Sequence, residues 1–390
     1  MGCPEMSEAV AVSAVSALKE RVRDLVDADL PALVALSEAL HADPETAWNE
    51  HRSAARLRDA LSARGFVVTP GYLGLETAFL ATAGSGPVRI GVCAEYDALP
   101  GLGHACGHNL IAAIAVGVAS SLAPLADELG ITVEVYGTPA EEGGGGKIEL
   151  LDRGAFAGLD LAVMAHPGPV DVAEARPFAV AHSHVRYDGK AAHAGAYPEE
   201  GVNANDAFVV AQVAIGLLRQ QLPHSARVHG IQTVGGQAPN AIPDRTEGRW
   251  YVRAETLAEL ESVEARVNRC FEAGALASGA TLTITPESKP YSEFRNDERA
   301  LGFYRANATA LGRVFDTSDS GKMNRASTDM GNVSQVVPAI HPYIGVNSLP
   351  ATNHQPEFAA ACVGPDAERA LRDAAVALAQ TVIDVARAAS

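Results

Sequence analysis

The chain has 390 residues, 47% of them hydrophobic and 20% charged, which is enough to build two domains with a sizeable core in each. Its net charge of −17 argues against nucleic acid as a partner, because phosphate binding needs clustered Lys and Arg and no such cluster occurs. No uncharged apolar run reaches the roughly 18–20 residues of a membrane span, so we expect a soluble protein without a membrane partner.

Two features of the sequence bear on its compartment. The N-terminus lacks a basic segment followed by an apolar core, so nothing marks it for secretion. The cysteines are odd in number and scattered: Cys3, Cys93, Cys106, Cys270 and Cys362. Because this usage is typical of reduced thiols, we expect the protein to be cytoplasmic.

Helical and strand patterns alternate through the first third of the chain. Apolar positions at three- and four-residue spacing predict helix over about residues 10–64, where His41 and His51 are expected to be surface or capping residues. Short apolar runs predict strands at 66–68, 77–80 and 88–94. An uncharged, alanine-rich helix is predicted over 110–122, with Asn109 as its N-cap.

The loop before this helix gathers reactive side chains. Residues 93–109 contain two carboxylates, two histidines and two thiols. Cys106 and His108 are separated by Gly107, a spacing that lets both face one zinc-like ion. Cys106 also lies just before a helix N-terminus, whose dipole favours a thiolate. Alone the triplet is a weak signal, because isolated matches are common.

Two further strands end at similar residues. The predicted strand at 131–136 runs into Glu141 and Glu142 in a glycine-rich loop, and the strand at 159–164 runs into His166. Because the carboxyl ends of parallel strands share one edge of a sheet, we expect these side chains to converge with Asp97. The sequence therefore predicts a site at that edge.

The glutamate pair admits two interpretations. Two adjacent glutamates in an otherwise apolar loop are costly to bury, unless a metal compensates one and the other serves as a base. A solvated acidic turn explains the same residues if the segment is taken alone. His166 and His354, each taken alone, also fit ordinary core or surface histidines.

The pattern changes near Arg176. A strand at 181–189, a helix at 203–222, strands at 227–234 and 247–254, a helix at 257–276 and a strand at 280–285 follow one another. This βαββαβ order is typical of a small ferredoxin-like layer inserted into another domain. We therefore predict a catalytic domain formed by 1–176 and 291–390 and an inserted domain at 177–290.

The remaining segment returns to the first domain. Helical signals after Pro290 precede a polar loop at 316–332, a strand near 342–346 and a loop that carries His354. A helix at 365–388 ends the chain. The predicted fold class is α/β, with a mostly parallel sheet in the catalytic domain and an α+β ferredoxin-like insert.

Taken together, these motifs resemble those of the metal-dependent aminoacylase/carboxypeptidase family of amidohydrolases. The runs E-Y-D-A-L-P-G-L-G-H-A-C-G-H-N and G-T-P-A-E-E-G-G-G-G-K are similar to the branch that contains aminobenzoyl-glutamate hydrolase and acylase-1-like-2 dipeptidases. The resemblance spans nearly the whole chain. It implies that two divalent metal ions are bound by Cys106, His108, Glu142, His166 and His354. It also implies that Glu141 is the catalytic base and that Asp97 orients a ligand histidine.

The same resemblance assigns roles in the insert. Residues 189–198 resemble the family's lid motif, in which His193 would reach the scissile carbonyl of a neighbouring subunit in a homodimer. Asn240 and Arg253 match the family's binders of the substrate carboxylate. Arg253 lies on the polar face of its strand and its planar fork suits a carboxylate, although a solvated strand face explains this position equally well.

Two departures narrow the resemblance. Asn109 stands where much of the wider family has Asp, and only residues 101–103 separate the A-L-P turn from H-A-C-G-H. Both fit the narrower branch. Thiolate ligation by Cys106 favours zinc over magnesium or calcium, although manganese or cobalt could serve.

The motifs, together with this resemblance, imply a metal-dependent amidohydrolase for N-acyl amino acids or dipeptides with a free carboxylate. A metal-activated water would attack the amide carbonyl, Glu141 would take its proton and pass it to the leaving amine, and His193 would help to stabilise the oxyanion. One alternative is a non-catalytic metal- or ligand-binding protein on the same fold, which would have no need of Glu141 beside the ligands. Another is a hydrolase of esters, lactones or carbamates, which would share the water-activating residues.

Overall fold

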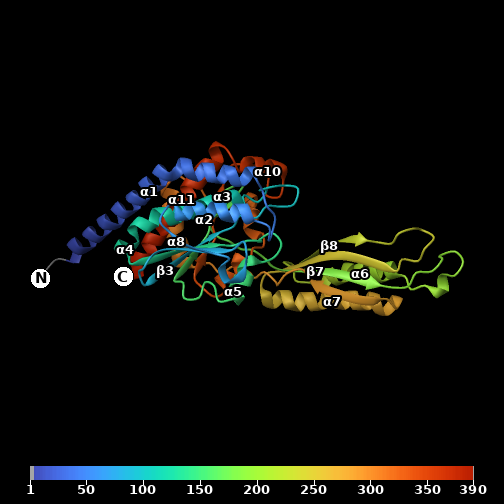
Figure 1. Cartoon of the computed structure of the whole chain (residues 1–390). Coiled ribbons are helices and arrows are strands. Elements are labelled where there is room, and N and C mark those ends of the chain that lie inside the picture. Colours follow the sequence, from blue (N-terminus) through green and yellow to red (C-terminus); the bar gives the residue numbers. More distant parts are fainter. Residues whose placement is uncertain (1–3, 390) are drawn as a thin grey trace. The chain divides into compact units, whose positions relative to one another are not determined.

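The computed structural model describes residues 4–389, which form two compact units (Figure 1). The first unit contains the chain up to Arg176 and from Phe294 onward, and the second contains Pro177–Glu293. Because the second unit interrupts the first in sequence, the first is discontinuous. The first unit contains two hydrophobic cores and the second unit contains one.

A six-stranded sheet in the order β1-β2-β4-β3-β5-β11 forms the centre of the first unit. Its strands are β1 Val67–Pro70, β2 Phe79–Gly84, β3 Val88–Ala94, β4 Ile131–Gly137, β5 Leu161–Val163 and β11 Ala339–Ile340. β4, β3, β5 and β11 are parallel, whereas β1 and β2 are antiparallel to their neighbours. The predicted mainly parallel α/β sheet is therefore confirmed.

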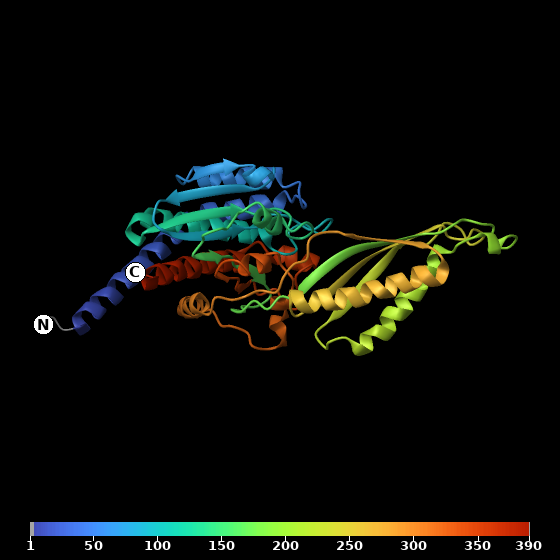
Figure 2. The same cartoon turned by 90° about the horizontal axis from the view of Figure 1, so that it is seen from below.

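The sheet is buried on both faces because alternate residues of β3 and β4 enter different cores. Ile90, Val92 and Val133 belong to one core, whereas Cys93 and Tyr136 belong to the other. The longer helices that contribute residues to the first core are α1 Pro4–Ala42, α2 His51–Ser62, α3 His108–Leu122, α8 Glu298–Ala310 and α11 Pro365–Ala389. Of these, α1, α3 and α11 lie side by side (Figures 1 and 2).

Two details of the predicted helices are wrong. The helix predicted over 10–64 is interrupted, because the loop 43–50 separates α1 from α2. Asn109 is not the N-cap of α3, since the helix begins at His108 after Gly107, whose φ is 83°. A side chain at Gly107 would also bring its Cβ within 2.8 Å of Pro167. Asn109 instead donates hydrogen bonds from inside the helix to Ser37 Oγ and the Cys362 carbonyl.

One stretch, His108–Leu129, is long and apolar enough to cross a membrane by length and composition. In the protein, 83% of its apolar window is buried. This is the behaviour of a core helix, in which apolar residues face other protein atoms.

The second unit contains a four-stranded antiparallel sheet in the order β10-β7-β9-β8. The strands are β7 Ala179–Asp188, β8 Arg227–Val234, β9 Arg245–Ala254 and β10 Thr281–Pro286. The helices α6 Ala204–Leu218 and α7 Leu257–Ser278 cover one face (Figure 2). The chain order is βαββαβ, and Trp250 and Val252 of β9 point into the core beneath the helices. β8 has a neighbour on one side only, so it is an edge strand.

The remaining elements are short. The helices are α4 Ala126–Leu129, α5 Gly146–Asp152, α9 Met330–Ser334 and α10 Pro356–Ala361, and the strands are β6 His166–Gly168 and β12 Tyr343–Gly345. The 3₁₀ turns are η1 Tyr72–Gly74, η2 Ala123–Leu125, η3 Pro198–Glu200, η4 Arg219–Gln221 and η5 Asp319–Arg325. Within the described residues four cysteines are free, namely Cys93, Cys106, Cys270 and Cys362. Cys3 lies outside the described residues.

Candidate metal centre

The carboxyl ends of β3, β4 and β5 meet at one edge of the sheet, because these strands are parallel and in register. β3 leads into Glu95 and Asp97, and β4 leads into the loop of Glu141 and Glu142. β5 is followed by β6, whose His166 pairs in register with Tyr343 of β12. Every residue of the first unit that the sequence predicts for the site lies in the segments that follow these strands, in α3 or in the loop of His354.

The side chains form two donor groups that share Cys106. One group consists of Cys106, His108 and His166, and the other of Cys106, Glu142 and His354, with the ligand atoms of each group within 4.8 Å of one another. Cys106 Sγ lies 3.6 Å from His166 Nε2, and His354 Nε2 lies 3.5 Å from Glu142 Oε1. Two donors on one tetrahedral zinc ion are separated by about 3.3–3.6 Å, so these spacings suit a metal ion.

Orientation of the histidines also suits a metal. His108 Nδ1 lies 3.0 Å from Asp97 Oδ1, and His166 Nδ1 lies 2.8 Å from the Pro167 carbonyl oxygen. If both Nδ1 atoms donate in these contacts, each Nε2 presents a lone pair to the shared donor region. His108 Nε2 is buried and has no hydrogen-bond partner. An orphaned buried acceptor beside a thiol and carboxylates is the arrangement that a cation would satisfy.

His354 reaches the site from a distant loop. Its backbone N–H donates to the Ala105 carbonyl at 2.8 Å, directly beside Cys106. Its φ of 68° lies in the left-handed region, which is uncommon for residues other than glycine. The backbone hydrogen bond to Ala105 thus holds His354 next to the H-A-C-G-H loop, in a conformation that is costly without such a contact.

Glu141 is buried, and its Oε2 lies 3.8 Å from His108 Nε2. It does not belong to the two groups that share Cys106 but to a third group with Glu95 and His108. Burial raises the pKa of Glu141 well above its usual range, and the negative charges of Glu95 and Glu142 raise it further. A carboxyl group whose pKa is raised in this way is suited to proton transfer.

Carboxyl groups outnumber cations in this buried cluster. Glu95, Asp97, Glu141 and Asp329 are buried, and the Glu142 side chain is only 11% exposed, while Lys147 supplies one positive charge. Burying unpaired carboxylates costs several kcal/mol each, so additional cations are expected. The charge balance and the donor spacing both fit divalent metal ions.

Sequence reasoning missed the ion network of Lys147. Its Nζ donates to Glu95 Oε1 at 2.5 Å and to Asp329 Oδ1 at 2.7 Å, and all three side chains are fully buried. Its backbone N–H also donates to Asp329 Oδ2. Lys147 therefore lies in the protein core, fully buried between these two carboxylates. The signal that could have located it is a lysine directly after a glycine run, in the first turn of the short helix α5.

Replacing Lys147 with Met is expected to lower the free energy of unfolding by about 3–5 kcal/mol, because Glu95 and Asp329 would lose their buried counter-ion. Denaturant unfolding measures this loss. The control is Lys190→Met, which removes an exposed lysine 3.7 Å from Glu200 and should change stability by less than about 1 kcal/mol. Equal, small changes in both variants would contradict the importance of the network.

Other histidines of the first unit lie outside the donor groups. His104 is buried and stacks on His41 with ring centroids 6.3 Å apart, and His51 lies 3.7 Å from Glu76 at the surface. His341 is buried 5.6 Å from His166, ring to ring, and burial lowers its pKa to about 3. Neither His41 nor His51 joins a metal-donor group among the described residues.

The remaining predicted residues belong to the second unit. His193 is exposed, its Nδ1 accepts from the Ala196 N–H at 3.1 Å, and it forms a β-bridge with Ala241. Asn240 is also exposed, and its carbonyl accepts from the Ala194 N–H. Arg253 Nε donates to His229 Nε2 at 3.3 Å. His193 and Asn240 therefore lie near each other, whereas Arg253 contacts the neighbouring strand β8.

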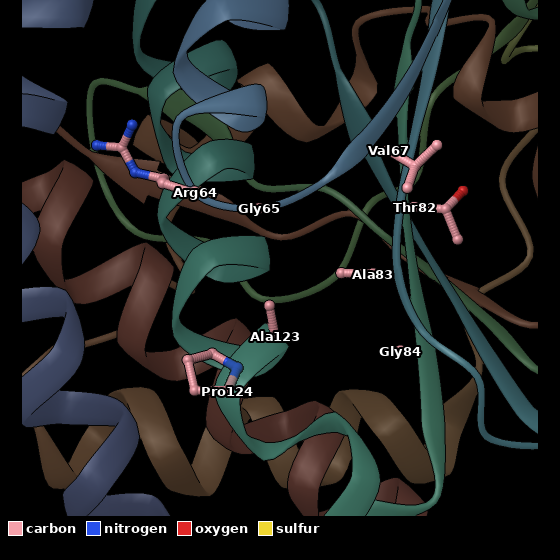
Figure 3. A pocket seen from close by; sticks show the side chains of 8 residues that line it. All are labelled: Arg64, Gly65, Val67, Thr82, Ala83, Gly84, Ala123 and Pro124. Atoms are coloured by element: carbon pink, nitrogen blue, oxygen red, sulfur yellow. The ribbon is translucent and has the colours of Figure 1, made fainter.

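An open hollow elsewhere in the first unit carries no comparable chemistry (Figure 3). It is lined by Arg64, Gly65, Val67, Thr82, Ala83, Gly84, Ala123 and Pro124. Arg64 is occupied by a bidentate pair with Asp29 at 2.7 and 2.8 Å. Gly84 pairs with Thr132 near the start of β4, so the hollow lies at the opposite end of that strand from Glu141.

Known proteins resemble this chain in sequence and in fold. Residues 91–383 match the model of peptidase family M20/M25/M40. The chain is 41% identical over 386 residues to the Xaa-Arg dipeptidase of Mus musculus, covering 94% of this chain and 89% of that protein. It is 31% identical over 282 residues to one of the subunits of p-aminobenzoyl-glutamate hydrolase from Escherichia coli, covering 67% of this chain and 59% of that one.

Among solved structures, a dinuclear metal-binding peptidase of family M20 from Bacillus subtilis has a TM-score of 0.70 at 23% identity. The match covers 92% of this chain and 99% of that one, so the two share a fold. The family match and the donor groups favour an enzyme over the alternative of a non-catalytic metal- or ligand-binding protein. The chain belongs to peptidase family M20/M25/M40, and it is a hydrolase of carbon–nitrogen bonds that uses divalent metal ions.

Proposed function

We propose that this protein is a dinuclear metallo-dipeptidase that also accepts N-acyl amino acids with a free carboxylate. The observation that carries the proposal is the pair of donor groups that share Cys106, with the Glu141 carboxyl group beside them. The proposed ligands are Cys106, His108, Glu142, His166 and His354. A set of thiolate, imidazole and carboxylate donors favours zinc, and manganese or cobalt could replace it.

The proposed mechanism assigns a task to each residue. The bound ions would supply Lewis-acid polarisation of the scissile carbonyl and of a water molecule. Glu141 accepts the proton of the attacking water and then donates it to the leaving nitrogen. Asp97 holds His108 through the contact of 3.0 Å and thereby fixes the ring for ligation. His193 donates a hydrogen bond to the oxyanion.

The substrate class that the relatives favour is a dipeptide with a C-terminal basic residue, since the mouse relative is named a Xaa-Arg dipeptidase. The test is hydrolysis of a panel in which one N-terminal residue precedes Arg, Lys, Leu or Glu. N-acetyl-arginine, p-aminobenzoyl-glutamate, and the matching ester and N-carbamoyl compounds complete the panel. Preference for dipeptides supports the proposal, whereas turnover confined to esters or carbamates would contradict it.

Replacing Arg253 with Ala is expected to impair substrates with a free carboxylate, with KM raised about tenfold or more, because a charged hydrogen bond contributes on the order of 1.5–3 kcal/mol. The measurement compares a dipeptide with its C-terminal amide. Arg249→Ala is the matched control, since Arg249 lies on the same strand but is paired with Glu287 at 2.6 Å. Equal loss on the acid and the amide would argue against carboxylate binding by Arg253.

We also propose that the second unit binds a second copy of the chain, as expected for a lid and dimerisation domain at about 177–290. Exposed apolar side chains of α6 and β8 support this: Val209, Val210, Val213, Leu217, Ile231 and Val234, with Leu217 71% exposed. β8 is also an edge strand, whose free backbone groups can pair with another strand. In the homodimer, His193 would serve the active site of the neighbouring subunit.

Replacing Leu217 with Asp is expected to convert the dimer into a monomer, because it places a charge in the apolar surface of α6. Light scattering after size-exclusion chromatography measures the mass. Leu276→Asp is the control, since Leu276 of α7 is 88% exposed but lies outside the proposed interface. A wild-type protein that is monomeric at micromolar concentration would refute the dimer.

The cytoplasmic location is likewise a proposal. Four free cysteines in the described residues, three of them buried, support a reducing compartment. Cell fractionation with an antibody against the protein tests it.

A further inference from the structure

The loop 43–50, which interrupts the predicted N-terminal helix, lies against the loop of the proposed base. The backbone N–H of Ala98 donates to the Glu45 carbonyl at 2.8 Å, and Thr46 forms a parallel β-bridge with Ala98. A Cβ at Gly144 would lie 2.3 Å from Trp48 Nε1, so the indole packs directly on the glycine run. This loop therefore contacts both segments that carry proposed catalytic groups.

Glu50 makes the most specific of these contacts. It is fully buried, and its Oε1 accepts hydrogen bonds from the backbone N–H groups of Trp48 and Ala140, each at 2.9 Å. Both donors belong to residues in the left-handed region, with φ of 65° at Trp48 and 58° at Ala140. Such a conformation is costly for residues other than glycine and persists only where surrounding contacts hold it.

Ala140 directly precedes Glu141, so its backbone conformation sets the direction in which the Glu141 side chain leaves the chain. On the other side, the N–H of Glu142 donates to Asp97 Oδ2 at 2.9 Å. The Gly145 N–H closes the turn on the Ala140 carbonyl at 2.9 Å. Hydrogen bonds therefore fix the backbone on both sides of Glu141. Glu50 accepts the one on the N-terminal side, from Ala140.

We propose that Glu50 is a positioning residue, which fixes Ala140 in its left-handed conformation and so aims Glu141 at the attacking water. The inference rests on the proposed function, in which Glu141 is the base. This positioning role depends on the length of the Glu50 side chain and on an acceptor oxygen at its end. It does not depend on the negative charge. Burial raises the pKa of Glu50 to about 7, and the charge of Asp97 adds to this, so the neutral acid is accessible.

Three substitutions of Glu50 separate the effect of side-chain length from the effect of charge. Glu50→Gln keeps the length and an acceptor oxygen and should retain kcat within about threefold. Glu50→Asp keeps the charge but is one methylene shorter, and Glu50→Ala removes the acceptor. Both are expected to lower kcat about tenfold to a hundredfold, with metal content unchanged and KM within about twofold, because a base displaced by about 1 Å transfers protons poorly.

Glu45 provides a matched control in the same loop. Its buried carboxylate accepts from the Ser53 N–H at 2.7 Å and from Ser53 Oγ at 2.9 Å at the start of α2, and its side chain does not bond the Glu141 loop. Glu45→Ala is expected to lower the melting temperature while kcat stays unchanged. A purely structural role of Glu50 would give the same result in Glu50→Ala.

The outcomes divide cleanly. Retention of kcat in Glu50→Gln together with its loss in Glu50→Asp supports the proposal, even where Glu50→Ala fails to fold. Loss in Glu50→Gln with retention in Glu50→Asp would show that charge matters, and wild-type kcat in Glu50→Asp and Glu50→Ala would show no positioning. Either result overturns the inference. Glu141→Gln is measured in parallel: if it remains active, the proposed function itself fails, and if it is inactive, only the role of Glu50 is at issue.

Discussion

Replacing Glu141 with Gln is expected to lower kcat by about 10²–10⁴-fold while metal content stays at the wild-type level. The amide cannot accept the proton of the attacking water, yet it keeps the size of the carboxyl side chain. Because Glu141 is buried and carries a raised pKa, removal of its charge should not destabilise the fold. Steady-state kinetics and elemental analysis of the same preparation measure both quantities.

The neighbouring glutamate serves as the control for this substitution. Glu142 belongs to a donor group with Cys106 and His354, so Glu142→Gln should lose metal as well as activity. If Glu141→Gln loses metal, or retains activity, the two roles have been assigned to the wrong glutamates. The two adjacent glutamates thus allow the loss of proton transfer to be measured separately from the loss of metal binding.

Replacing Cys106 with Ala is expected to weaken the binding of both ions by more than about a hundredfold, because its sulfur is shared by the two donor groups. His354→Ala and His166→Ala each remove a donor from one group and should leave one ion in place. Competition with a metal-sensitive dye measures the number and affinity of the ions. Activity should be lost in all three variants.

Cys93→Ala is the control for the thiol. Cys93 is also buried and free, but it packs in the hydrophobic core and belongs to none of the donor groups. It should bind the same number of ions as the wild type. If Cys106→Ala also binds that number, the shared thiolate is refuted.

Much of the fold could be predicted because its signals are local. The apolar run of β3 and the pattern of β4 and β8 give strands at nearly the predicted residues, since period and composition are read directly from sequence. The interruption at residues 43–50 was missed because its turn is held by the buried Glu45 and Glu50 carboxylates, whose polar contacts do not alter helical periodicity. The start of α3 was misplaced because close packing of Gly107 on Pro167 is a tertiary contact.

The candidate site was only partly predictable. The convergence of Asp97, Glu141 and His166 could be predicted, because the carboxyl ends of neighbouring parallel strands lie at the same edge of a sheet. His354 could be added only through the family resemblance, because a distant loop carries it. The partners Lys147 and Asp329 are 182 residues apart, and nothing local in the sequence links them. Likewise, the contact from Glu50 to Ala140 spans 90 residues and depends on the folded sheet.

The most direct test of the dinuclear site is elemental analysis of the purified protein, combined with hydrolysis of a Xaa-Arg dipeptide before chelation, after chelation and after metal is restored. The proposed ligands predict about two transition-metal ions per chain, together with activity that is lost with the ions and regained with them. A protein that hydrolyses the dipeptide equally well without metal, or that binds no second ion when metal is supplied in excess, would contradict it.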